Sequence, residues 1–115
     1  MKFKRPAAKA TLDIAFWFTL RADSSGIRLS HQKLQYLLFL SQGHYIGNHS
    51  GAKLMPASFF ITDSGPIEPN IYHLYQSYLD NKLSLNGNIL SLVVEDFLTK
   101  MWALYGNLSE ERLLS

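Results

Sequence analysis

The feature that most restricts this chain is a corner with one glycine and two prolines, inside the stretch FFITDSGPIEPNIYHLY (residues 59–75). Pro66 and Pro69 each hold φ near roughly −65°, so an extended apolar run must turn sharply and a helix can begin at a defined place. Gly65 allows a backbone angle or a close approach that a side chain would block. We therefore expect a rigid turn that sets the direction of the helix after it.

The Asp63-Ser64-Gly65 sequence within this corner resembles the GDSGG context of chymotrypsin-like serine proteases. Such an enzyme needs two β-barrels, a buried aspartate and a positioned histidine, and this chain is too short and too helical for that. Asp-Ser-Gly is also ordinary turn composition. We expect no catalytic residue and no cofactor, and a hydrolase using His31 or His73 with Asp63 is only a third hypothesis. The four histidines lack metal-site spacing, so no metal is expected.

The overall composition is that of one globular domain. The chain has 115 residues, of which 47% are hydrophobic and 17% charged, and it has no cysteine. Thiol nucleophiles, thiolate metal sites and disulfides are therefore excluded. The longest apolar run, residues 14–20, is far shorter than the roughly 18 residues that span a bilayer. We expect a soluble cytoplasmic protein without membrane contact.

The apolar spacing predicts a mainly α, single-domain bundle of four to five helices. Residues 54–61 are aromatic and β-branched near their end, which favours a short extended segment, paired in a hairpin with residues 82–90 or packed on the helices. Residues 46–52 contain Gly47 and Gly51 and are expected to form a loop. Gly106 is expected just after a helix end. The expected helices are residues 11–25, Ser30–Tyr45, Asn70–Leu79, Ser91–Tyr105 and Glu110–Leu114.

Positive charge is concentrated at the N-terminus. Four of the eleven Lys and Arg residues precede residue 10. The rest of the chain contains the other seven, together with all nine Asp and Glu residues. We expect residues 1–9 to be a flexible basic arm and residues 10–115 to be the folded domain. Contact with phosphate, as in a nucleic-acid-binding regulator, is the alternative function, although a tail of this kind is more often a solvated terminus. The residues for this alternative are Lys2, Lys4, Arg5 and Lys9.

Aromatic residues are numerous for a chain of this length, at 13%. A small domain cannot bury all of them, and exposed aromatic side chains in patches mark interfaces. Tyrosine suits this position because its ring prefers an apolar neighbour while its hydroxyl prefers water. These residues therefore favour a binding module over an enzyme.

Two motifs resemble the Panacea (SocA-like) domain family. HQKLQYLLFLSQGHYIG, residues 31–47, is similar to that family's KLQKLLYFAQGW segment and includes Lys33 and Leu34. Gly65-Pro66-Ile67 followed by Pro69-Asn70-Ile71-Tyr72 is similar to its G-P-V-x-P-x-V-Y corner, and residues 104–115 are similar to its approach to the C-terminus. The family usually continues past this point, so the chain is expected to be a short or C-terminally truncated relative.

The resemblance implies a mainly helical, non-enzymatic domain that binds another protein. Family members act as antitoxins that neutralise a toxin by direct contact, or as adaptors that present a partner to a protease. A homo-oligomer is a further partner that the sequence leaves open. The contact surface is expected around the glycine-proline corner and its flanking helices, at Gln35, Tyr36, Gln42, Tyr72 and His73.

Overall fold

Five helices and a two-stranded hairpin make up the part of the chain that the computed structural model describes, residues 5–78 and 89–114. This confirms the predicted mainly α domain with a small hairpin. The described part contains no helix of the length and apolar character needed to cross a membrane. The elements are α1 (Thr11–Ser24), α2 (His31–Asn48), β1 (Phe60–Thr62), β2 (Gly65–Ile67), α3 (Pro69–Tyr78), α4 (Leu92–Tyr105) and α5 (Glu110–Leu114).

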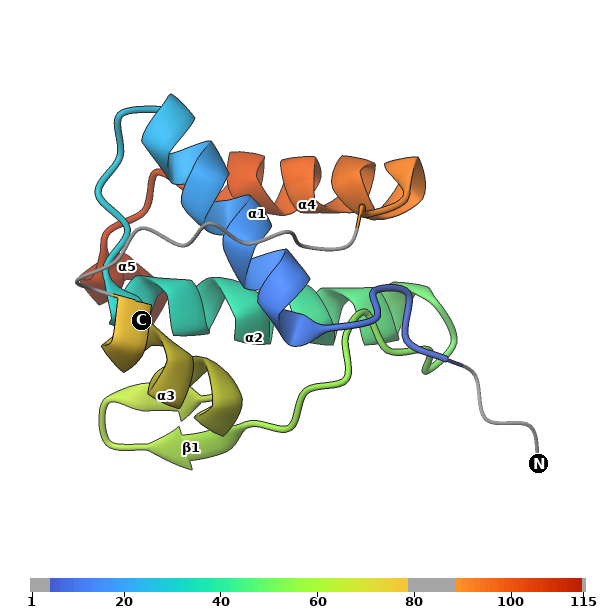
Figure 1. Cartoon of the computed structure of the whole chain (residues 1–115), viewed down its shortest axis with the longest axis horizontal. Coiled ribbons are helices and arrows are strands. Elements are labelled where there is room, and N and C mark those ends of the chain that lie inside the picture. Colours follow the sequence, from blue (N-terminus) through green and yellow to red (C-terminus); the bar gives the residue numbers. More distant parts are fainter. Residues whose placement is uncertain (1–4, 79–88, 115) are drawn as a thin grey trace.

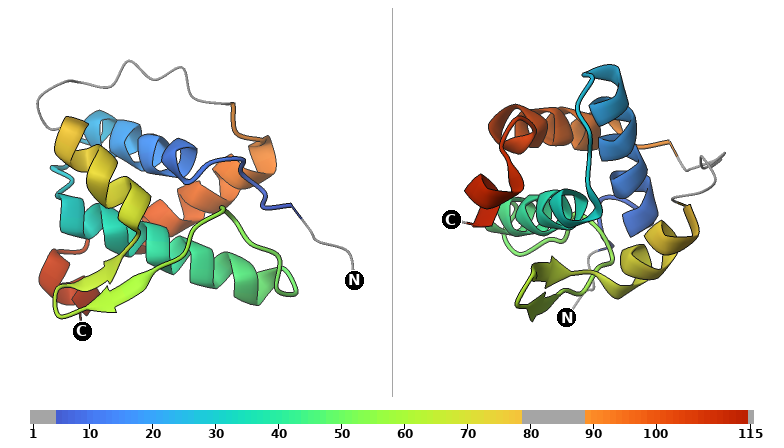
Figure 2. Two further views of the ribbon diagram at one scale, coloured as in Figure 1. Left: turned by 60° about the horizontal axis from the view of Figure 1, so that its bottom comes forward. Right: turned by 90° about the vertical axis from the view of Figure 1, so that its left-hand side faces the viewer.

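Helix α2 is the centre of the arrangement and contacts α1, α3, α4, α5 and β2. It lies between α4 on one side and the hairpin on the other, while α1 crosses it at a steep angle (Figure 1). Figure 2 shows the same order from two further directions, with α3 beside the hairpin. The corner that joins β2 to α3 is therefore positioned by the central helix of the fold.

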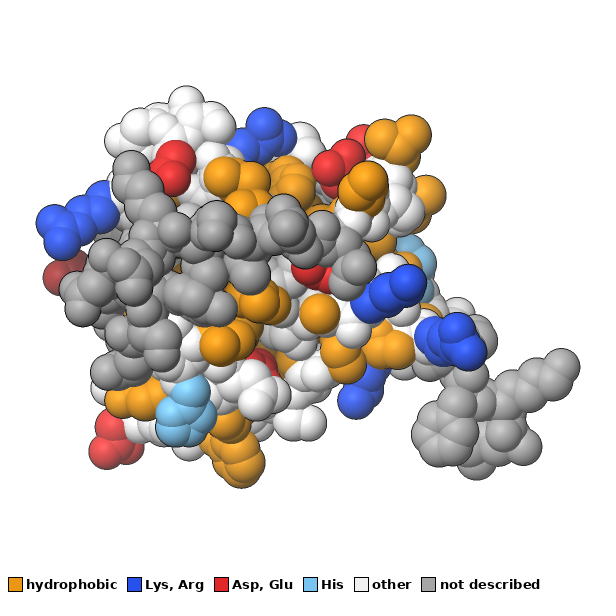
Figure 3. Space-filling view, viewed as in Figure 1, with side chains coloured by type: hydrophobic (Ala, Val, Ile, Leu, Met, Phe, Trp, Pro, Cys, Tyr) orange, Lys and Arg blue, Asp and Glu red, His pale blue; other side chains and the backbone are white. Residues whose placement is uncertain are grey.

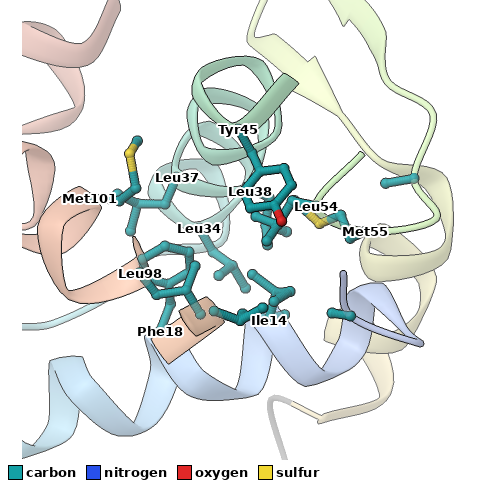
Figure 4. Close-up of a cluster of buried hydrophobic side chains, with 14 of the residues drawn as sticks. Ile14, Phe18, Leu34, Leu37, Leu38, Tyr45, Leu54, Met55, Leu98 and Met101 are labelled. Atoms are coloured by element: carbon teal, nitrogen blue, oxygen red, sulfur yellow. The ribbon is translucent and has the colours of Figure 1, made fainter. Parts of the chain in front are cut away.

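The hydrophobic core lies where α1, α2 and α4 meet the segment that follows α2 (Figure 4). Its members come from apolar positions three or four residues apart in each helix, which is the spacing of one buried helical face. Burial of each large side chain stabilises the fold by roughly 1.5–3 kcal/mol. The large core side chains that are 2% exposed or less are Ile14, Phe18, Leu34, Leu37, Leu38, Leu54, Met55, Val94, Leu98 and Met101.

The hairpin joins two neighbouring segments of the chain. β1 pairs antiparallel with β2, with Phe60 opposite Ile67 and Thr62 opposite Gly65, while most of the partner segment expected from the sequence, residues 82–88, lies outside the described residues. The chain reverses immediately after Thr62 because Gly65 has φ +109°, so the nearest segment becomes the partner strand. Residues 79–88, including the predicted Asn86-Gly87-Asn88 turn, lie outside the described residues.

Two boundaries also need correction. Helix α2 continues through Gly43 and Gly47 to Asn48, so the predicted loop at residues 46–52 begins only after Asn48. A glycine inside a helix costs only about 1 kcal/mol, which the packing of this central helix exceeds. The N-terminal arm is held from residue 7 onward, because Ala7 N–H donates to Lys53 O at 3.0 Å and Ala8 N–H to Leu54 O at 2.7 Å.

Candidate functional site

The candidate site is the joint between α2 and the glycine-proline corner, which we call the corner joint (residues 60–75 with the first half of α2). Glu68 lies at its centre and is 2% exposed. Its carboxylate accepts a hydrogen bond from Ile71 N–H at 2.7 Å and one from the Asn70 side-chain amide at 3.3 Å. The carboxylate thus caps α3 at the end where acidic groups are favoured, and Pro69 occupies the first helical position.

The backbone of Glu68 is held by Gln35 of α2, which is 1% exposed. The Gln35 carbonyl oxygen accepts from Glu68 N–H at 2.8 Å, and its amide nitrogen donates to Glu68 O at 3.3 Å. One buried side chain therefore binds both main-chain groups of the residue just before α3, and the carbonyl of that residue also accepts from Tyr72 N–H at 3.0 Å. This two-point contact fixes α3 against α2.

The turn of the hairpin is fixed by two other residues of α2. Gln32 Nε2 donates to Ser64 O at 2.6 Å. The Tyr36 ring lies so close to Gly65 that a Cβ at that position would be 2.5 Å from the phenolic oxygen. Together with φ +109°, this confirms that Gly65 provides both an unusual backbone angle and a close approach.

An aromatic stack closes the joint on the side of α3. The His31 ring is stacked on Tyr75 with centroids 4.4 Å apart and is 5.3 Å from the ring of Tyr72. His31 Nε2 lies 2.9 Å from Gln35 Nε2, and because the Gln35 oxygen is used by Glu68, the imidazole must accept this bond. Burial lowers the pKa of His31, which agrees with a neutral ring. Burial also raises the pKa of Tyr75, with Arg28 opposing the shift.

Three of the five predicted partner contacts need correction, since their side chains are buried. Gln35 and Tyr36 hold the corner as described, and Gln42 holds the segment after α2 by accepting from Leu54 N–H at 3.0 Å and Met55 N–H at 3.1 Å. Buried amides of this kind support the backbone and do not reach a partner. Tyr72, which is 40% exposed, and His73 remain accessible on α3.

Three other residues of the two motifs are buried and contribute to the packing of the fold. Leu34 belongs to the core, and Pro66 is buried in β2. Lys33 is 6% exposed, and its ammonium donates to the carbonyl of Gly106 at the end of α4. Burial lowers the pKa of Lys33, with Glu110 opposing the shift. Gly106 follows the last residue of α4 and has φ −60°, an angle that any residue adopts. A glycine suits this position because the Trp102 ring occupies the place where a Cβ would lie.

The sequence did not identify the exposed apolar side chains of the hairpin. Phe60 and Ile61 are 63% and 72% exposed, and Phe39 on α2, at 37%, is part of the same surface through its contact with Phe59. Figure 3 shows hydrophobic side chains at the lower margin of the molecule, over the hairpin. An apolar run such as FFIT has the composition of a buried strand, and only its position at the edge of the fold reveals that it is exposed.

The basic residues of the arm are only partly described. Lys2 and Lys4 lie outside the described residues, while Arg5 and Lys9 are exposed. The hydrogen bond from Ala7 to Lys53 brings a third exposed cation, Lys53, beside them. Figure 3 shows Lys and Arg side chains gathered at this end of the molecule.

Three of the four histidines use a ring nitrogen in a hydrogen bond with another group of the chain. His44 Nε2 lies 2.9 Å from the hydroxyl of Tyr105, and His49 Nδ1 donates to Tyr45 O at 2.9 Å. Among residues 5–78 and 89–114, no three His, Asp or Glu side chains are grouped so that they could hold a metal ion.

Comparison of the chain with protein-family models, with curated proteins and with solved structures gave no match.

Proposed function

We propose that this chain is a protein-interaction domain that resembles the Panacea (SocA-like) antitoxins and proteolytic adaptors. The observation that carries the proposal is the contrast within the corner joint. Its interior is held by buried hydrogen bonds of Gln35 and Glu68, while Phe60 and Ile61 at its outer side are mostly exposed. Exposed apolar side chains on a rigid support are the usual mark of a protein interface.

The rigid support matters because ordering a loop on binding reduces affinity. Each rotamer-rich side chain that must be immobilised costs about 0.5–1.5 kcal/mol, and a preformed hairpin avoids part of this cost. Gln32, Tyr36 and Gln35 hold the turn and the start of α3 before any partner arrives. The corner joint therefore presents β1 and the exposed face of α3 in a fixed relation.

The test is direct binding to the product of the neighbouring open reading frame, measured by isothermal titration calorimetry with both proteins purified. We expect binding that is weakened at least tenfold by Phe60→Ser together with Ile61→Ser. Leu92→Ser is the matched control, since Leu92 is 77% exposed but lies at the start of α4, away from the hairpin (Figure 1). Equal affinity of the hairpin variant and the wild type contradicts the assignment of the surface.

The antitoxin and adaptor roles can be separated in the same system. An antitoxin of this kind restores growth of cells that express the neighbouring gene without any protease. An adaptor does so only when the protease is present, and the steady-state level of the partner then falls. Loss of protection in the Phe60→Ser, Ile61→Ser variant, with retention in Leu92→Ser, is the expected result for either role.

The second candidate function is nucleic-acid binding by the basic end. It is favoured by the exposed positions of Arg5, Lys9 and Lys53, which the pairing of Ala7 with Lys53 brings together. Binding through three phosphate contacts weakens with a slope of about −2.7 in log K against log salt for duplex DNA. Fluorescence anisotropy with a labelled duplex, repeated with these three residues changed to Gln, distinguishes this function. Affinity that is insensitive to salt and to these changes removes it.

A further inference from the structure

Within the described part of the chain, the pairing of β1 with β2 leaves the other edge of β1 unpaired. Ile61 lies opposite Pro66, which has no N–H, so these two residues cannot exchange hydrogen bonds. In an antiparallel ladder hydrogen-bonded and non-hydrogen-bonded pairs alternate, so Phe60 with Ile67 and Thr62 with Gly65 are the bonded pairs. The N–H and C=O of Ile61 consequently point away from β2.

This outer edge is accessible. All three residues of β1 are exposed, and β1 lies at the outer margin of the molecule in Figure 1, with β2 between it and α3. Within residues 5–78 and 89–114, no hydrogen bond of the loops or side chains uses the main chain of Ile61. Proteins usually protect such edges by keeping the strand short or with a charge, a proline or a bulge. β1 is short, at three residues, but Phe60-Ile61-Thr62 contains no charge, proline or bulge.

Apolar side chains flank the edge on both faces. Alternate residues of a strand share a face, so Phe59 and Ile61 lie on one face and Phe60 on the other. Phe39 extends the first face, because its ring meets that of Phe59 edge-on at a centroid distance of 5.4 Å. A strand laid beside β1 would therefore find main-chain partners at Ile61 and apolar contacts above and below them.

The area of this surface argues against a second copy of the chain as the occupant. An aromatic or large aliphatic side chain has roughly 200 Å² of surface, so Phe39, Phe60 and Ile61 at 37%, 63% and 72% leave about 350 Å² exposed. A stable dimer buries about 800 Å² per partner. The surface is instead the size that a few residues of an extended segment cover.

From these observations we propose that β1 binds an extended, apolar segment of a partner protein by adding it as a third strand to the hairpin. This inference rests on the proposed function and names the mode of contact. The segment pairs with the N–H and C=O of Ile61 and places apolar side chains against Phe39 and Ile61 on one face and Phe60 on the other. Recognition of this kind obtains affinity from the main chain and selectivity from alternate side chains.

The probe is a display library of random linear twelve-residue peptides, selected on the wild-type chain. Ile61→Pro removes the outward N–H while keeping an apolar residue, and proline is tolerated at outward positions of edge strands. Ile61→Val is the matched control, since it keeps the N–H. We expect apolar peptides whose affinity falls at least tenfold with Ile61→Pro and less than threefold with Ile61→Val.

A second measurement uses the wild-type chain and does not depend on the folding of the proline variant. Amide hydrogen exchange by NMR should show fast exchange at Ile61 in the free protein and protection at Ile61 in the peptide complex. Phe60 and Thr62, whose N–H groups face β2, should change little. Peptides that bind without protecting Ile61 contradict strand addition while leaving the proposed function intact.

Two further outcomes would overturn the inference. A library that yields no peptide dependent on Phe60 and Ile61 excludes an extended apolar segment, whereas binding of the neighbouring gene product still tests the proposed function by itself. A dimer that forms near 100 µM in sedimentation experiments and is lost with Ile61→Pro assigns the edge to a second copy of the chain.

Discussion

Substitution of Gly65 by alanine tests the corner joint most directly. The backbone at Gly65 has φ +109°, which costs an L-residue about 1–2 kcal/mol. The added Cβ would lie 2.5 Å from Tyr36 Oη and 2.7 Å from its Cζ, well inside ordinary contact. Forcing atoms into a packed site costs typically about 1–3 kcal/mol more. We therefore expect Gly65→Ala to lower the free energy of unfolding by about 3 kcal/mol.

The assay is urea unfolding followed by circular dichroism, and the chain contains matched controls. Gly26 also has positive φ, +68°, but has nothing within 4 Å of its Cβ position, so Gly26→Ala should cost only the backbone strain of about 1 kcal/mol. Gly43 lies exposed inside α2, also in open space, so Gly43→Ala should stabilise the protein by up to about 1 kcal/mol.

A double-mutant cycle separates the two causes at Gly65. In a Tyr36→Leu background the ring atoms are gone, so the cost of Gly65→Ala should fall toward that of Gly26→Ala. If Gly65→Ala costs no more than Gly26→Ala in the wild-type background, the contact with Tyr36 is not tight and the explanation of the glycine is wrong.

Three other changes probe the remaining parts of the structure. Gln35→Leu leaves the buried N–H of Glu68 without a partner, while the Glu68 C=O keeps its bond from Tyr72 N–H at 3.0 Å, and the change should cost about 1–3 kcal/mol in urea unfolding, with equal stability of variant and wild type contradicting the two-point contact. Because burial lowers the pKa of His31 below 6.5, the unfolded chain binds more protons, so stability should be full above pH 6.5 and fall as the pH drops through that value. His31→Phe keeps a ring beside Tyr75 and should flatten this part of the stability curve, whereas an unchanged slope assigns it to other groups. Ser91→Ala removes the oxygen that accepts from Val94 N–H at 3.2 Å and should cost about 1 kcal/mol, measured by thermal unfolding, and a loss below 0.3 kcal/mol would show that the cap is not formed in solution.

Capping residues and prolines in the sequence were sufficient to predict where most of the helices begin. Ser30 and Ser91 immediately precede α2 and α4, and each side-chain oxygen accepts from the N–H three residues later, as N-cap residues do. The proline at position 69 set the start of α3 within one residue. These features depend on a few neighbouring residues, which is why sequence patterns predict them well.

The position of the hairpin and the role of the amides depended on contacts that sequence spacing does not encode. Gln35 and Gln42 are polar and were expected at a surface, but each is buried because it satisfies main-chain groups of a distant segment. The pairing of β1 with β2 was not expected for a related reason, since Pro66 is an unusual strand residue that is tolerated only where no N–H is needed. The exposed Phe60 and Ile61 could be recognised only from their place in the fold.

The spacing of the residues on α2 explains why the two motifs form one unit. Gln32, Gln35 and Tyr36 are three and four residues apart, so they share one face of the helix, and each contacts the corner at Ser64, Glu68 or Gly65. Lys33 lies about 100° away and instead reaches Gly106 at the end of α4. A shift of one residue in α2 would therefore exchange these contacts and place a lysine against the corner. A substitution in the corner or in the first half of α2 therefore affects the contacts of both segments. A partner that binds β1 contacts a hairpin whose turn this helix already holds in place.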